Sequence, residues 1–394
     1  MSRLKVLFLF GMVIVVLAAP TLLLGVGTAR AASTIARGKW SIVTSLSPGA
    51  KGNDLAGVAA LSANDVWATG TALNGNAQML IEHWNGSAWN LVSSPEPPDH
   101  FIDLLGITAV TSNDIWTVGN YYTSGSFLPK TLTEHWNGTS WNYVSSPDPS
   151  SYIDELSGVS ADATNDAWAV GAFNNMMESQ QTLIEHWNGT AWSIVPSPNV
   201  GADGNVLSSV ITISPNDAWT VGYYTDSMGY QKALIEHWDG SSWSVVANPS
   251  PDSNYYALRG ISAVSANDIW AVGDFQKIHG RDNNLIEHWN GTQWEIVLSP
   301  RPGNYFNSLA SVSALSANDV WTVGTLSNNS GSVQTFIEHW NGKAWHAASS
   351  PNVGSDDNLL GGVAVVPGTS EVWAVGEYDN SSFINQTLIE CYCT

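Results

Sequence analysis

The chain has 394 residues, 44% of them hydrophobic and 12% charged, with 20 tryptophans and a net charge of −21. This composition is typical of a folded chain with a large core and excludes a disordered one. The acidic excess would repel the phosphates of nucleic acid and the headgroups of anionic lipids, so we expect no nucleic-acid partner. Much of this acidity recurs at fixed repeat positions and therefore need not reflect a particular ligand.

Residues 1–32 have the pattern of an export signal. Arg3 and Lys5 precede a mostly apolar stretch over 6–24, and an Ala-x-Ala cleavage motif follows at 29–31. We therefore expect a secreted or extracellular protein. The apolar stretch is long for a signal peptide, so an uncleaved membrane anchor is the alternative, and the protein would then contact the membrane through this segment alone.

From residue 38 onward, one unit repeats along the chain. A glutamate followed in most copies by His-Trp-Asn-Gly returns every 51 or 52 residues, as Glu82, Glu134, Glu185, Glu236, Glu287, Glu338 and Glu390. A period near 50 is typical of propeller blades or solenoid turns.

The copy over 156–196 shows how one repeat is built. Its four short segments, which we name a, b, c and d, cover 156–161, 167–171, 182–187 and 192–196. They alternate in polarity or are too short for helices, so we predict strands. Asn165-Asp166 suits a turn between a and b, and Asn188-Gly189 is a strong hairpin signal between c and d.

The 20 tryptophans occupy three positions of the repeat. Seven lie in strand b, six in strand c and seven at the start of strand d. Because each ring can bury roughly 150–250 Å², we expect them to pack one blade against the next.

The seventh repeat stops at Thr394, before its strand d. Segment 38–43 matches strand d and precedes the first complete set of strands, so it can pair with 387–390 as the outer strand of the last blade. This pairing closes a ring and removes the exposed sheet edge. We predict an all-β, seven-bladed β-propeller with four-stranded antiparallel blades, occupying residues 38–394 as a single domain, and we expect a monomer.

The chain ends on Cys391-Tyr392-Cys393-Thr394, where five of the other six repeats have His-Trp-Asn-Gly. This ending is either natural or the product of a frameshift, and we expect blade 7, which lacks one tryptophan, to be the weakest. The two cysteines do not make a disulfide framework. We expect free thiols or an intermolecular bridge.

Two sequence strings carry a resemblance to other proteins. The first, IEHWNGTxWxxVxSP, is complete over 184–198. The second, GVxAxSxNDVWAVG, is matched over 260–273 with isoleucine in place of its first two valines. The chain is similar to a set of uncharacterised secreted bacterial proteins with these repeats. In repeat length and aromatic placement it also resembles kelch, galactose-oxidase and Asp-box propellers, although the kelch double glycine and the usual Asp-box signature are absent. The resemblance implies the fold and not the function.

Six histidines follow the repeated glutamate, at His83, His135, His186, His237, His288 and His339. Strand c lies two strands from the axis, so these side chains should not converge on one metal ion. We expect each imidazole to bridge polar groups between blades, and we expect the glutamates to be structural as well.

Function is expected where the repeats differ, in the d-to-a and b-to-c loops that share one face. Two residues before the leading leucine of each strand a stand Asn53, Ile102, Asp154, Asn205, Tyr256, Asn307 and Asn358. We expect them to ring the mouth of the central channel, where amides and carboxylates could bind sugar hydroxyls or Ca²⁺. The alternative is that they only cap turns at strand starts.

A second irregularity is a group of basic residues around blade 5. It comprises Arg259, Lys277, His279, Arg281 and Arg301, with Tyr255, Tyr256 and Tyr305 nearby. On an acidic protein such a group could hold a carboxylate or sulfate of a polysaccharide. Chance clustering is the alternative.

These patterns favour a secreted, non-catalytic binding or scaffold propeller that recognises a carbohydrate or a cell-surface partner through the loop face. The alternatives are a carbohydrate-active enzyme of the glycosidase or lyase kind on the same face, and a purely structural surface repeat protein. A galactose-oxidase site needs a cysteine within the propeller, and a sialidase site needs three arginines at the axis, where only Arg259 is expected. The spacing from strand-d to strand-b tryptophans is 27 residues in six of seven cases, which leaves no room for a lid or catalytic insertion.

Overall fold

The structure is a computed structural model that describes residues 38–95, 100–123, 125, 128–177, 179–201, 203–251, 253–277, 282–328, 331–354 and 356–393. The predicted export signal over 1–32 lies outside the described residues. Across the described ranges, the regular elements are 28 strands. No helix in this part of the chain is long and apolar enough to cross a membrane.

The strands form seven four-stranded antiparallel sheets, each of which is one blade. Blade 1 contains β2 (Gly52–Ser62), β3 (Asp65–Leu73), β4 (Ala77–Trp84) and β5 (Trp89–Leu91). Blade 2 contains β6 (His100–Thr111), β7 (Asp114–Thr123), β8 (Pro129–Trp136) and β9 (Trp141–Tyr143). Blade 3 contains β10 (Asp154–Ala163), β11 (Asp166–Asn174), β12 (Gln180–Trp187) and β13 (Trp192–Ile194).

The remaining blades follow the same a-b-c-d order. Blade 4 contains β14 (Asp203–Ser214), β15 (Asp217–Thr225), β16 (Gln231–Trp238) and β17 (Trp243–Val245). Blade 5 contains β18 (Ser253–Ser265), β19 (Asp268–Lys277), β20 (Asp282–Trp289) and β21 (Trp294–Ile296). Blade 6 contains β22 (Asn307–Ser316), β23 (Asp319–Ser327), β24 (Val333–Trp340) and β25 (Trp345–Ala348). Blade 7 contains β26 (Asn358–Val365), β27 (Val372–Asp379), β28 (Asn385–Cys393) and β1 (Lys39–Ile42).

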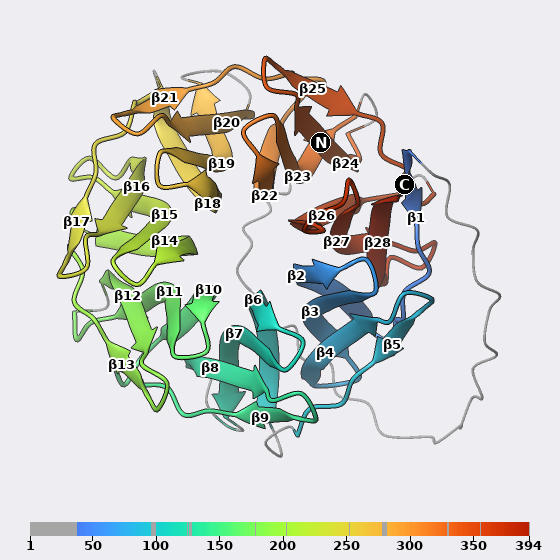
Figure 1. Ribbon diagram of the computed structural model, residues 1–394, viewed down its shortest axis with the longest axis horizontal. Helices are drawn as coiled ribbons and strands as arrows, with labels where there is room; N and C mark the ends of the chain where they lie inside the picture. Colours follow the sequence, from blue (N-terminus) through green and yellow to red (C-terminus); the bar gives the residue numbers. More distant parts are fainter. Residues whose placement is uncertain are drawn as a thin grey trace, which may run out of the picture. The chain divides into compact units, whose positions relative to one another are not determined.

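The blades stand in a ring with strand a of each blade innermost, which confirms the predicted seven-bladed propeller (Figure 1). The predicted closure is also confirmed, because β1 pairs antiparallel with β28 and places Ile42 opposite Glu390. The Val43 amide adds a hydrogen bond of 2.8 Å to the carbonyl of Ile389. The first and last strands of the chain therefore share one sheet.

Each strand-b tryptophan packs against the strand-c and strand-d tryptophans of the next blade. Trp116 of blade 2, for example, lies 4.9 Å from Trp187 and 5.1 Å from Trp192 of blade 3, measured between ring centroids. At the interface of blades 6 and 7, Trp321 meets Tyr392 at 5.2 Å and Trp40 at 5.5 Å. Tyr392 thus replaces the missing strand-c tryptophan, and the expected blade-on-blade packing is confirmed.

The repeated histidines act within a blade, so the expectation that they bridge blades was wrong. Strands b and c pair Trp168 opposite His186, which lets the two rings lie 4.3 Å apart. The imidazole Nε2 also hydrogen-bonds Asp166 Oδ1 at 2.6 Å. The same histidine–aspartate bond, at 2.6 to 2.9 Å, occurs in all six blades that have the histidine. The reason is the register, which makes the histidine and tryptophan direct cross-strand neighbours.

The repeated glutamates, in contrast, join one blade to the next. All seven are fully buried. Ser350, which follows strand d of blade 6, donates to Glu390 of blade 7 at 2.8 Å, and Ser94 donates likewise from blade 1 to Glu134 of blade 2 at 2.7 Å. Glu185 is an exception, since both its carboxylate oxygens are buried without a hydrogen-bond partner.

The cysteines differ from the expectation of free thiols or an intermolecular bridge, because Cys391 and Cys393 form an intramolecular disulfide. Side chains two residues apart in a strand project from the same side, and here the two Cα atoms are 5.4 Å apart, within the range for a disulfide. Cys391 takes the histidine position opposite Trp373.

We expect His186→Ala to lower the free energy of unfolding by about 1–3 kcal/mol, because it leaves the buried Asp166 carboxylate without its donor. Chemical denaturation followed by tryptophan fluorescence measures this. The exposed His346, whose imidazole bonds the exposed Asn341 side chain, provides the matched control. A loss for His186→Ala no larger than that for His346→Ala would contradict the structural role.

The buried glutamates predict that stability falls as pH rises. Burial raises the pKa of Glu82 to about 8 and that of Glu185 to about 9, from an ordinary value of 4.5. The folded chain therefore binds more protons than the unfolded chain between these values, so this stabilisation is complete below pH 4.5 and is lost as pH rises through 8 to 9. Melting temperatures recorded from pH 5 to pH 9.5 should fall, and Glu185→Gln should reduce the slope. A melting temperature that rises over this range would exclude the assignment.

Candidate functional site

The two faces of the ring differ in how far their connections repeat. In antiparallel blades the a-to-b and c-to-d turns lie on one face and the b-to-c and d-to-a loops on the other. The c-to-d turns are near copies of one another: Asn188 Oδ1, for example, accepts from the amides of Thr190 and Ala191, and Asn290 does the same two blades later. The other face, which we call the loop face, carries the variation and is the candidate site.

The innermost strands of all seven blades line a central cavity of about 200 Å³. Small residues make up much of this wall because the strands approach closely; a Cβ added to Gly158 would lie 3.0 Å from the Cα of Ser209 in the next blade. Among the residues that line the cavity, Arg259 is the charged one. The sequence-based placement of Arg259 near the axis is therefore confirmed.

The amides expected at the channel mouth lie elsewhere, beneath the d-to-a loops. Asn205 is fully buried, its Oδ1 accepts from the amides of Val200 and Gly201, and its Nδ2 donates to Gly201 O and Gln180 O. Asn53, Asn307 and Asn358 are also buried and bond their own loops in the same way.

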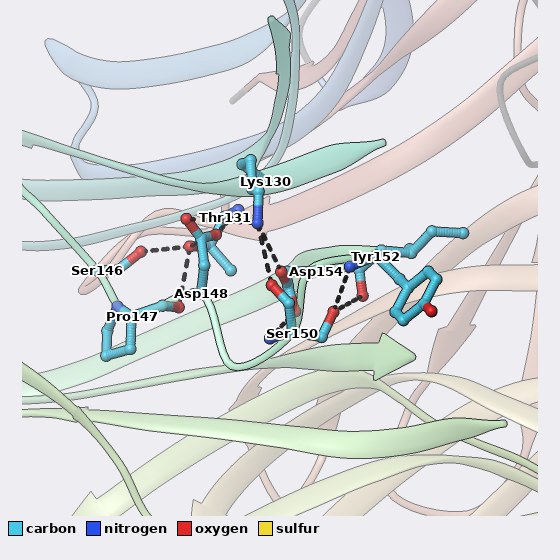
Figure 2. A network of polar contacts seen from close by, with 9 residues as sticks. Lys130, Thr131, Ser146, Pro147, Asp148, Ser150, Tyr152 and Asp154 are labelled. Atoms are coloured by element: carbon cyan, nitrogen blue, oxygen red, sulfur yellow. Dashed lines mark hydrogen bonds and ion pairs between the residues drawn. The ribbon is translucent and has the colours of Figure 1, made fainter. Parts of the chain in front are cut away.

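The other members of this set are buried too. Asp154 is fully buried and accepts from the Ser150 amide at 3.1 Å and from Lys130 Nζ at 3.2 Å, as Figure 2 shows. Tyr256 lies under the ammonium of Lys232, 5.1 Å from its ring centroid, and Ile102 has no exposed surface. The prediction that these seven side chains ring the mouth of the channel was therefore wrong.

The reason is strand alternation. Asn53 lies two residues before Leu55, so both side chains project from the side of the strand that packs between blades. The turn-capping alternative accounts for the observed bonds, and ligand binding by these residues stays a prediction. Among the described residues, no group of three or more histidine, cysteine, aspartate or glutamate side chains is arranged to hold a metal ion, so the structure adds no support for a Ca²⁺ site.

The basic group divides between two places. Arg259 Nε donates to the buried Asp274 at 2.6 Å, which neutralises its charge at the cavity wall. Arg301 is exposed on the d-to-a loop into blade 6, with its guanidinium 5.2 Å from the Phe275 ring. In the same loop Tyr305 is 58% exposed. Arg281, His279 and the side chain of Lys277 lie outside the described residues, and anion binding by this group stays a prediction.

Sequence reasoning missed an arc of carboxylates one residue further along strand a. We call Asp54, Asp103, Glu155 and Glu377 the acidic arc; the first three directly precede a leading leucine, and Glu377 lies on strand b of blade 7. Burial, together with the charges of Glu377 and Asp103, raises the pKa of Asp54 to about 8. Burial and the nearby Asp103 charge also raise the pKa of Glu155. Asp54, Asp103 and Glu155 lie at the loop-face end of the innermost strands, Glu377 lies near the loop-face end of β27, and all four are partly desolvated.

Comparison with known proteins shows the fold alone. No protein-family model matches the chain, and no curated protein matches it. Among solved structures, one of YCF48 bound to a D1 peptide superposes with a TM-score of 0.56 at 12% identity, covering 92% of this chain and 100% of that one. A Trypanosoma rangeli sialidase in complex with sialic acid superposes with a TM-score of 0.51 at 12% identity, covering 90% of this chain and 59% of that one.

We expect Asn205→Ala to free the d-to-a loop of blade 4. The substitution removes the buried Oδ1 acceptor of the Val200 and Gly201 amides and should lower the free energy of unfolding by about 1–2 kcal/mol. Hydrogen exchange at the amides of Val200 and Gly201 should accelerate, while exchange in the β16–β17 hairpin stays unchanged. Unaltered exchange at both amides would contradict the capping role.

Proposed function

We propose that this protein is an exported, non-catalytic binding module that recognises a carbohydrate or a cell-surface protein through its loop face. The observation that carries the proposal is the division of roles around the ring. The repeated tryptophans, histidines and glutamates are committed to packing within and between blades. The loop face alone combines variable connections with the acidic arc, Arg259 in the cavity wall and exposed aromatic side chains.

The loop face favours binding over catalysis. The sialidase alternative needs three arginines at the axis, whereas Arg259 is the arginine of the described cavity wall and is already bonded to Asp274. These connections vary in sequence but are short and nearly constant in length, so they hold no segment long enough to close over a substrate. A rigid ring with exposed groups on one face suits recognition, since little conformational entropy is lost on binding.

Two kinds of partner agree with this face. Tyr305 and Arg301 supply an exposed aromatic ring and an exposed cation from the same loop, and such groups can stack on a sugar ring and bond its substituents. The solved propellers of similar fold include one bound to a peptide and one bound to sialic acid, which supports either class without choosing between them.

A glycan array and a panel of cell-surface extracts, probed with the purified propeller, test the proposal. We expect Arg301→Ala together with Tyr305→Ala to weaken any binding found by about tenfold or more, as for the loss of central contact residues. The matched control is Lys343→Ala, which removes an exposed cation from the c-to-d turn of blade 6 on the opposite face. Binding that is lost in Lys343→Ala and retained in the double variant would place recognition on the opposite face and contradict the proposal.

A further inference from the structure

Three b-to-c loops of the propeller are closed by the same two backbone hydrogen bonds. In blade 4, the amide of Asp226 bonds Tyr230 O and the amide of Gly229 bonds Asp226 O. The loops that start at Asn328 in blade 6 and Asn380 in blade 7 repeat both bonds. The fourth position of each loop has a positive φ, and it is held by Gly229 (81°), Gly331 (87°) and Phe383 (56°).

Phe383 is therefore an aromatic residue in a place where the same loop elsewhere uses glycine. A phenylalanine in the left-handed region strains the backbone, because its Cβ approaches the neighbouring carbonyl. Burial of the ring does not offset this cost, since Phe383 is 75% exposed. Residues held in unfavourable backbone regions cluster at binding sites, and an exposed phenylalanine gains from contact with a partner.

The surroundings of Phe383 are acidic. Its loop joins β27 to β28, and Asn385 at the start of β28 bonds Glu377 and receives a bond from Asn53 of blade 1 through its carbonyl. Asp54, next to Asn53, is raised in pKa chiefly by burial and then by Glu377 and Asp103. The exposed Leu73, at the end of β3 in blade 1, pairs with Gly52, which directly precedes Asn53 in β2. One sector, from the tip of blade 7 to the innermost strand of blade 1, thus combines apolar tips with carboxylates.

We propose that this sector of the loop face docks a basic segment of a partner protein, with an apolar side chain covering Phe383 and a lysine or arginine entering the acidic arc at Asp54 and Glu377. The inference rests on the proposed binding function and specifies its partner. Charge complementarity selects the occupant: the carboxyl groups of Asp54 and Glu377 lie close together in the sector, and Lys51 is the cation that the loop into blade 1 contributes to it. A cationic side chain there gains an electrostatic interaction that an acidic or neutral one lacks.

The test is selection of a phage-displayed random peptide library on the immobilised propeller. We expect enriched peptides to pair lysine or arginine with aromatic or aliphatic residues, and their binding to weaken with added salt. Phe383→Gly should weaken the binding of these peptides about tenfold. The same variant should melt at an equal or higher temperature than the unsubstituted protein, because glycine adopts the left-handed conformation freely.

Two further variants complete the experiment. At pH 9, where Asp54 is ionised, Asp54→Asn should weaken peptide binding, and Met177→Ser, which changes an 87% exposed residue on blade 3, should leave it unchanged at the same pH. No enrichment of basic peptides, or equal binding to Phe383→Gly, would overturn the inference. Glycan binding in the absence of peptide enrichment would refute this inference while preserving the proposed function, and failure of the glycan array, the surface extracts and the library together would refute both.

Discussion

The interlocking of tryptophans between neighbouring blades is the interaction on which the rest of the structure depends. A strand-b ring of one blade lies against two rings on strands c and d of the next, at centroid distances near 5 Å. Rings at this separation combine large apolar burial with tilted and edge-on aromatic contacts. Every interface between blades contains a strand-d tryptophan, so the propeller can close in the same way only if β1 supplies Trp40 to blade 7. The closure is thus required by packing as well as by the need to cover a sheet edge.

The polar residues of the repeat complete this framework in two directions. The histidine–aspartate bond fixes strand c to strand b inside a blade, and the buried glutamate receives donors from the preceding blade. Since these positions recur with little change, the blade interiors and the face opposite the loop face are nearly the same in all seven blades. The loop face departs from this regularity, which is why we place recognition there.

The fold could be predicted because its signals are local and repeated, as Asn-Gly hairpins and as tryptophans at fixed spacing. The closure of the ring could be predicted because a strand-d pattern precedes the first complete repeat. The site could not be predicted as well, because both sides of a propeller blade are buried and polarity does not show which alternate residues face the channel. Asn53 and Asp54 are equally plausible from sequence, and only the structure shows that Asn53 caps a loop while Asp54 belongs to the acidic arc. A signal for Phe383 was present, since Asn380-Ser-Ser-Phe383 aligns with Asp226-Ser-Met-Gly229.

The central claim is that the repeat positions hold the ring together and the loop face binds. A scan of single substitutions across the described residues, displayed on yeast and sorted separately for folded protein and for binding to a selected partner, tests it most directly. The account predicts that losses of folding map to the tryptophan, histidine, aspartate and glutamate positions, and that losses of binding with folding intact map to the b-to-c and d-to-a loops. Binding losses concentrated on the Asn-Gly turns of the opposite face would contradict it.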